Sequence, residues 1–378
     1  MVVRVSIEPR VLAWAIDRTG LTITDLSERS DFKNIQSWMD GDLEPTVKQA
    51  EKLAAQAQVP FPYLLLESPV QEGIDLPDFR TVRSVPVTEA SPELEITVQD
   101  CRGRLDWYVE YAREMAIDSP NSVGRFGIDD DPITVARNFS NEIGWEAGRY
   151  SLGDRAVSEL SDFIENLGVL VMRSSMVRNN SRRPLDPEEF RGFAMIDRGF
   201  ALIFVNARDS KSAQLFSLAH EFAHVLLGEP GVSGQDLGSS SGVEPWCNRF
   251  AAEFLIPAEF FAREWRKFDR IEDAVLHISS RLGVSPEATI WRGVNLSYIG
   301  EDESSRLVEQ LSYRGPKKQP GGGDGIRNMR PRLGKRFLNA AASVVGTDLL
   351  PVREAMYLMG VRKHETLLRL AGHAGEAA

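Results

Sequence analysis

Apolar residues recur at helical spacing over most of the chain, and one central region has shorter apolar runs typical of strands. The N-terminal region predicts short helices at 9–20, 22–30, 32–41 and 46–58. Further helices are predicted at 96–116, 133–144, 156–168, 212–227, 243–256, 270–283 and 285–297. Strands are predicted at 169–175, 190–197 and 201–207. The expected fold class is therefore α+β, mainly α with a small β-sheet.

Changes in composition divide this pattern into parts. The segment "GPKKQPGGGDG" at 315–325 has the composition of a flexible linker, and Pro, Asp and Val are frequent between 69 and 95. The predicted parts are a helical domain (1–70), a connector (71–95), a main domain with N-terminal helices (96–312), a basic Gly-rich linker (313–326) and a small C-terminal helical module (327–378).

Overall composition is that of an ordinary globular protein. The 378 residues are 42% hydrophobic and 26% charged, with a net charge of −11. This balance argues against a surface built entirely for nucleic acid or an anionic membrane. Two cysteines, no signal-peptide pattern and no apolar run long enough to cross a bilayer lead us to expect a cytoplasmic protein without a membrane partner.

The first 70 residues carry the motifs "LSERS", "IQSWMDGDLEPT" and "AEKLAAQAQVP". These resemble the XRE-type helix-turn-helix family, which implies binding to operator DNA. Lys33, Asn34 and Gln36 are the candidate DNA-contacting residues, because their side chains can read base edges. However, the segment has seven basic and ten acidic residues, whereas a phosphate-binding module should be positive. A helical module used for protein contacts is the alternative.

A second region of interest is basic. Residues 313–339 contain eight Lys or Arg residues and a single acidic residue, Asp324. This segment could follow a phosphate backbone, contact an acidic partner or simply be a solvated linker.

The stretch "FSLAHEFAHVLLGEP" at 216–230 uses two of the five histidines of the chain. His220 and His224 are four residues apart, so they lie on the same face of a helix and can bind one Zn²⁺ ion. Glu221, one position further round, can act as a general base on a water held beside the metal.

A catalytic zinc site needs a third protein ligand and one open position. The downstream candidates are Glu229, Asp236, Glu244 and Glu253. Glu244 and Glu253 are nine residues apart on a predicted helix and face opposite sides, so only one can point at the metal. Asn248 shares the face of Glu244 and can support a liganding histidine from outside the coordination sphere. We therefore predict Glu244 as the third ligand.

The residues "ALIFVN", "FSLAHEFAHVLL" and "EPWCNRFAAEFLIP" together resemble the ImmA/IrrE-type metallopeptidases. The resemblance implies a gluzincin-like domain with His220, His224 and Glu244 as zinc ligands and Glu221 as the base. Cys247 stands where the family usually has alanine, and a thiol near zinc could make the site sensitive to oxidation. Either strand "GFAMI" at 192–196 or strand "ALIFV" at 201–205 could present an open edge to an extended peptide substrate.

Two functions follow from these resemblances. The first is a zinc-dependent endopeptidase that acts on a regulatory protein such as an XRE-type repressor. The alternative is an antitoxin or transcriptional regulator that binds a partner toxin, operator DNA or both without catalysis. The expected partner is thus a protein substrate or a toxin, and operator DNA and a second copy of the chain remain candidates.

Overall fold

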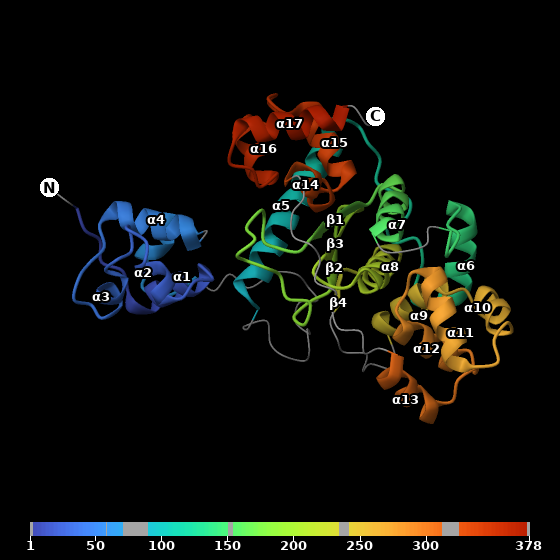
Figure 1. Cartoon of the computed structure of the whole chain (residues 1–378). Helices are drawn as coiled ribbons and strands as arrows, with labels where there is room; N and C mark the ends of the chain where they lie inside the picture. Colours follow the sequence, from blue (N-terminus) through green and yellow to red (C-terminus); the bar gives the residue numbers. More distant parts are fainter. Residues whose placement is uncertain are drawn as a thin grey trace. The chain divides into compact units, whose positions relative to one another are not determined.

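The computed structural model describes residues 3–57, 59–70, 90–149, 154–233, 242–311 and 325–375. The chain divides into two compact units, one formed by Met1–Ile74 with Ala90–Glu95 and the other by Asp75–Glu89 with Ile96–Ala378 (Figure 1). No helix of the described ranges combines the length and the apolar character needed to cross a bilayer.

The first unit is helical. Its elements are α1 (Pro9–Arg18), α2 (Ile23–Ser27), α3 (Ile35–Met39), α4 (Val47–Ala57) and the 3₁₀ helix η1 (Phe61–Leu65). Thr22 and Asp25 form a capping box that starts α2. Leu26, Ile35 and Trp38 are buried in a core with residues of α1 and α4. The predicted helix at 32–41 is reduced to the five residues of α3.

The second unit is built on a four-stranded sheet of order β1-β3-β2-β4. The strands are β1 (Leu170–Ser174), β2 (Gly192–Asp197), β3 (Phe200–Asn206) and β4 (Gly231–Ser233). β1 runs parallel to β3, and β2 is antiparallel to both β3 and β4. The three longer strands confirm the predicted sheet, and the α+β class is confirmed as well. The short strand β4 was not predicted.

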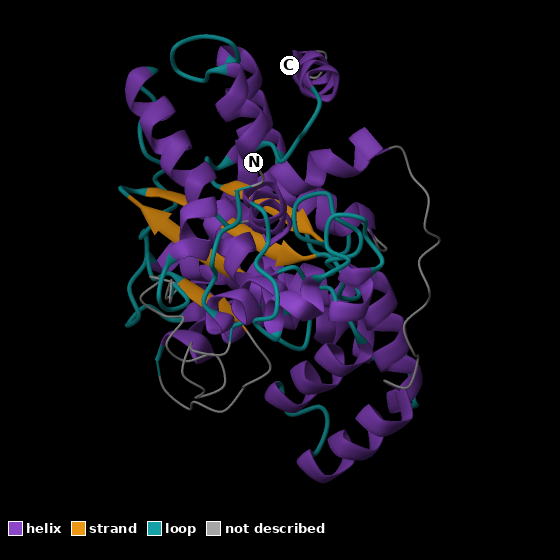
Figure 2. Ribbon diagram, turned by 90° about the vertical axis from the view of Figure 1, so that its left-hand side faces the viewer, coloured by secondary structure: helices purple, strands orange, loops and turns teal. Residues whose placement is uncertain are grey.

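Helices cover both faces of this sheet (Figures 1 and 2). α7 (Asp154–Asn166) and α8 (Lys211–Leu227) pack on one face, where Ile203 and Val205 enter the main core. α5 (Pro92–Glu114), α14 (Gly325–Leu333) and α15 (Lys335–Val344) lie on the other face. Because side chains alternate along a strand, the apolar residues of β3 serve two cores, which explains why all seven of its residues are buried.

A second group of helices packs beside α8. It contains α6 (Pro132–Ile143), α9 (Val243–Leu255), α10 (Ala258–Trp265), α11 (Ile271–Leu282), α12 (Pro286–Asn295) and α13 (Glu301–Leu311). α9 contacts both α8 and α6, and its rings Trp246, Phe250 and Phe254 stack one after another along the helix. This packing fixes the rotation of α9 relative to α8.

The C-terminal helices pack against the sheet and α5. Besides α14 and α15 they are α16 (Val352–Leu358) and α17 (His364–Gly375). Arg104 of α5 donates from Nε to the carbonyl of Leu358 over 2.8 Å, and Trp107 donates to the carbonyl of Leu349 over 3.1 Å. In the described end of the basic segment, Arg336 donates to the Tyr108 hydroxyl over 2.7 Å and Lys335 pairs with Asp162. The predicted linker falls largely outside the described residues.

Candidate metal centre

The two histidines lie in the second half of α8. The helix begins after Ser210, whose hydroxyl accepts the N–H of Ala213, and ends at Gly228 in the left-handed conformation. His220 and His224 are both buried, 3% and 1% exposed. A buried imidazole pair needs polar partners, and these come from α9 and from the segment after α8.

Three ligand atoms converge at this point. The Nε2 atoms of His220 and His224 are 3.2 Å apart. Glu244, in the first turn of α9, places Oε2 3.1 Å from Nε2 of His220 and Oε1 3.2 Å from Nε2 of His224. Among the described residues, these three form the group of His, Cys, Asp or Glu side chains that could hold a metal ion.

In each imidazole, Nδ1 already has a hydrogen-bond partner. Nδ1 of His220 lies 3.0 Å from Oδ1 of Asn248, and Nδ1 of His224 lies 3.2 Å from the carbonyl oxygen of Glu229. Both oxygens are acceptors, so each Nδ1 carries the proton and each Nε2 turns a lone pair inward. Two imidazole lone pairs and a carboxylate facing each other at about 3 Å would repel without a cation between them. The donor set therefore fits Zn²⁺ with a fourth position left open.

The electrostatics of Glu244 agree with this picture. Partial burial raises the pKa of its carboxyl, but the hydrogen bonds and positive charge that His220 and His224 supply when protonated at Nε2 outweigh burial and hold the pKa well below its usual range. A metal ion between the three side chains would supply positive charge in place of these protons. Glu244 is thus a carboxylate, the form that binds a metal.

Two glycines let the sheet approach these side chains. A Cβ at Gly192 of β2 would lie 3.1 Å from Oε1 of Glu221, and a Cβ at Gly231 of β4 would lie 2.6 Å from Nδ1 of His224. Glu221 itself is fully buried on α8. Neither glycine was predicted, because a close approach between a strand and a helix has no local sequence signal.

The other acidic candidates for the third ligand are placed elsewhere. Glu253 is buried between Arg137 and Arg292 and forms ion pairs with both. Glu229 contributes its backbone carbonyl to His224, while its side chain is exposed. Asp236 lies outside the described residues.

Cys247 lies on α9 between Glu244 and Asn248 and is fully buried. Burial raises the pKa of its thiol, and the charges of Glu244 and Glu221 raise it further. The thiolate is the form that reacts with oxidants, so the protonated thiol of Cys247 makes the expected sensitivity to oxidation small.

Of the two strands that could have offered an open edge to a peptide, one is paired on both sides. β3 is central and paired on both sides, so 201–207 offers no open edge. β2 pairs with β4 only through Gly192, Phe193 and Ala194, which leaves Met195–Asp197 without a strand partner on that side within the described part of the chain. Of the two strands considered, only the second half of β2 lacks a strand partner on one side within the described residues, and the outer strands of the sheet are β1 and β4.

The candidate DNA-contacting residues lie in the first unit, at the start of α3. Lys33, Asn34 and Gln36 are exposed, and Gln36 donates to Oδ1 of Asp40 over 2.9 Å. Trp38 points into the core instead. The role of the three polar residues in binding DNA stays a prediction.

Residues 164–292 match the family model of the IrrE N-terminal-like domain, the M78 peptidases. The match spans β1 to β4 and both helices that carry the ligand atoms, and it supports the resemblance to ImmA/IrrE-type proteins. A search of the curated proteins found no match. The family match and the side-chain geometry thus both support a peptidase-like domain in this part of the chain.

Proposed function

We propose that the chain is a zinc-dependent endopeptidase that regulates another protein by cleaving it. The observation that carries the proposal is the convergence of His220, His224 and Glu244 within 4.8 Å of one another, beside the buried Glu221. The family match over residues 164–292 supports a metallopeptidase-type domain. A cytoplasmic location, favoured by two buried free cysteines, is part of the proposal.

The residues of the site have separate tasks in this proposal. His220, His224 and Glu244 hold the metal, and Asn248 and the Glu229 carbonyl orient the two imidazoles. Bound zinc would supply a Lewis acid that polarises the scissile carbonyl and activates water. Glu221 takes a proton from the attacking water and delivers it to the leaving amine. The backbone of Gly192 and Gly231 closes the inner side of the site.

The substrate proposed is a regulatory protein such as an XRE-type repressor. Support comes from the family resemblance and from the presence of an XRE-like segment in the same chain. An extended peptide could add to the sheet at the edge formed by β4 and the second half of β2. No observation on the described residues favours the antitoxin alternative.

The test is cleavage of an XRE-type repressor encoded beside the gene for this chain. Purified full chain and its Glu221→Gln variant are incubated with the repressor, and products are followed by mass spectrometry. The variant keeps shape and metal ligands, so we expect equal metal content and a rate lower by about 10² or more. Equal cleavage rates for the two proteins would reject Glu221 as the base, and no cleavage by either would reject this substrate.

A further inference from the structure

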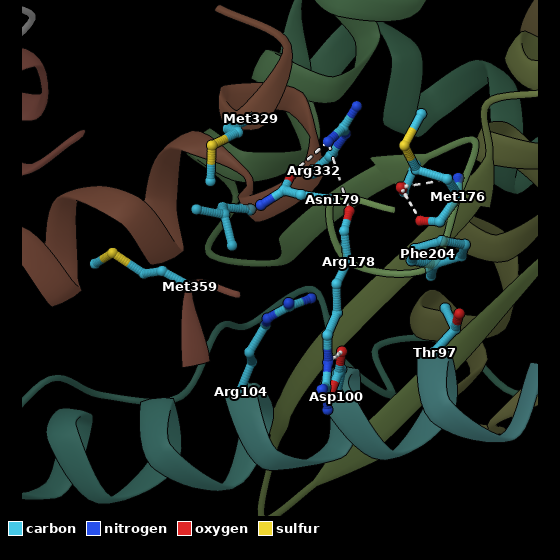
Figure 3. A pocket seen from close by; sticks show the side chains of 12 residues that line it. Thr97, Asp100, Arg104, Met176, Arg178, Asn179, Phe204, Met329, Arg332 and Met359 are labelled. Atoms are coloured by element: carbon cyan, nitrogen blue, oxygen red, sulfur yellow. Dashed lines mark hydrogen bonds and ion pairs between the residues drawn. The ribbon is translucent and has the colours of Figure 1, made fainter. Parts of the chain in front are cut away.

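A pocket lies on the face of the sheet opposite α8, in the second unit. It is lined by side chains of α5, of β1 and β3, of the segment after β1, and of the C-terminal helices (Figure 3). Three arginines reach it from three separate segments: Arg104 of α5, Arg178 after β1 and Arg332 of α14. The lining has one acidic residue, Asp100.

One of these charges is balanced within the protein. Arg178 forms two parallel hydrogen bonds with Asp100, of 2.9 Å from Nε and 2.8 Å from Nη2. This paired geometry uses both oxygens of the only carboxylate in the lining. Asp100 is therefore committed to Arg178.

The other two guanidinium groups bond to neutral acceptors. Arg104 donates to the Leu358 carbonyl and to the sulfur of Met172, and only 8% of the residue is exposed. Arg332 donates to the Asn179 side chain and weakly to the Arg178 carbonyl. Within the described ranges of the chain, neither forms an ion pair with a carboxylate.

The thiol of Cys101, next to Arg104, does not supply the negative charge that would balance the two guanidinium groups. Burial raises the pKa of Cys101 to about 12, even though the adjacent Arg104 lowers it. Cys101 is therefore neutral at physiological pH. Burial also lowers the pKa of Arg332, with no anion counteracting it. Arg104 is buried and Arg332 is half-buried. Because charges removed from water are generally paired in proteins, two guanidinium groups without a carboxylate partner in one pocket point to an external anion.

We propose that this pocket binds a small phosphate-type oxyanion, which Arg104 and Arg332 neutralise. The polar side chains beside them are already engaged, since the Ser174 hydroxyl donates to the Met176 carbonyl over 2.6 Å and Nδ2 of Asn179 donates to the Gly360 carbonyl over 2.9 Å. The two guanidinium groups are therefore the main donors, and a tetrahedral oxyanion has enough oxygens to accept several of their N–H groups. About 30 Å³ is open to the centres of water-sized groups, which is room for a single ion or one phosphate group of a larger ligand. Because Arg104 and Arg332 belong to α5 and α14, the anion would tie the C-terminal helices to the rest of the unit.

The experiment titrates the full chain with inorganic phosphate in a non-coordinating buffer and follows thermal unfolding and binding heat. Sodium chloride at matched ionic strength and sodium acetate run in parallel. We expect a saturable rise of the unfolding midpoint with phosphate, and no comparable rise with chloride or acetate. An acetate response as strong as that of phosphate would overturn the phosphate-type assignment.

Arg104→Gln and Arg332→Gln each remove one charge from the pocket, and Arg102→Gln removes one from the same helix outside it. The pocket variants should weaken phosphate binding about tenfold or more, and the control should bind like wild type. A structural role alone would lower the midpoint equally with and without phosphate. That result, or equal phosphate binding by all four proteins, would overturn the proposal.

Hydrogen exchange of the wild-type chain gives a readout that needs no variant. Phosphate should slow exchange of the α14 amides, and chloride should not. Identical exchange in the two salts would contradict the proposed site even if a pocket variant fails to fold.

Discussion

The backbone of Gly231 lies against the imidazole of His224, so that a Cβ at position 231 would come within 2.6 Å of Nδ1. The carbonyl of Glu229, two residues earlier, accepts a hydrogen bond from that same nitrogen. The segment that follows α8 thus holds the second histidine from two sides, which fixes both its tautomer and its position.

Gly231→Ala should therefore damage the metal site without removing a ligand. The added methyl group displaces His224 or separates β4 from β2, and we expect zinc affinity to fall about tenfold or more. Competition with a fluorescent chelator measures the affinity. Gly300→Ala is the matched control, because a Cβ there meets nothing within 4 Å. Wild-type affinity in Gly231→Ala would show that the contact is unimportant.

Asn248→Ala removes the acceptor 3.0 Å from Nδ1 of His220. The imidazole then loses its orientation, and zinc affinity should fall about 10-fold to 100-fold. Asn248→Asp keeps an acceptor oxygen and should retain tight binding. If the alanine and aspartate variants bind zinc equally well, Asn248 does not position His220.

Glu244 and Glu253 lie on the same helix but should respond differently to substitution. Glu244→Gln should lose zinc while the chain stays folded, because it removes a ligand charge from a half-buried position. Glu253→Gln should keep zinc but lower the free energy of unfolding by about 3–5 kcal/mol, because it leaves the buried Arg292 without its carboxylate. Metal analysis and denaturant unfolding of both variants check this, and the opposite pattern would make Glu253 the ligand.

Glu165 should make stability depend on pH. Burial raises the pKa of its carboxyl to about 7, although backbone N–H groups of Arg336 and Lys335 act in the opposite direction. The folded chain then holds a proton that the unfolded chain has lost, so stability falls as pH rises from about 4.5 to 7 and is constant above that.

The size of this effect is at most about 3 kcal/mol, from about 1.4 kcal/mol for each pH unit between the two pKa values. Glu165→Gln cannot titrate and should remove this part of the slope. Denaturant unfolding at several pH values between 5 and 8 compares the two proteins. Parallel curves for wild type and variant would mean that Glu165 has an ordinary pKa.

Local pattern was enough to predict the main features of the site. The spacing of His220 and His224 places them on one face of a helix, and the same argument puts Glu244 and Asn248 together on α9. The three longer strands could also be predicted from the sequence, because their β-branched and aromatic runs are typical of buried strands.

The missing features all depend on contacts between distant residues. β4 has only three residues and becomes a strand by pairing with β2. Arg104 and Arg332 line one pocket although 228 positions separate them, which no local pattern indicates. The ion pairs of Glu253 with Arg137 and Arg292 likewise join three helices, so only the structure explains why this carboxylate is buried.

The proposed function depends first on a zinc ion held by His220, His224 and Glu244. The most direct measurement is elemental analysis of full chain purified without chelators, alongside His220→Ala. We expect about one zinc per wild-type chain and almost none in the variant. Freshly prepared wild-type protein that is folded but contains no divalent metal, and takes up none when zinc is added, would contradict it.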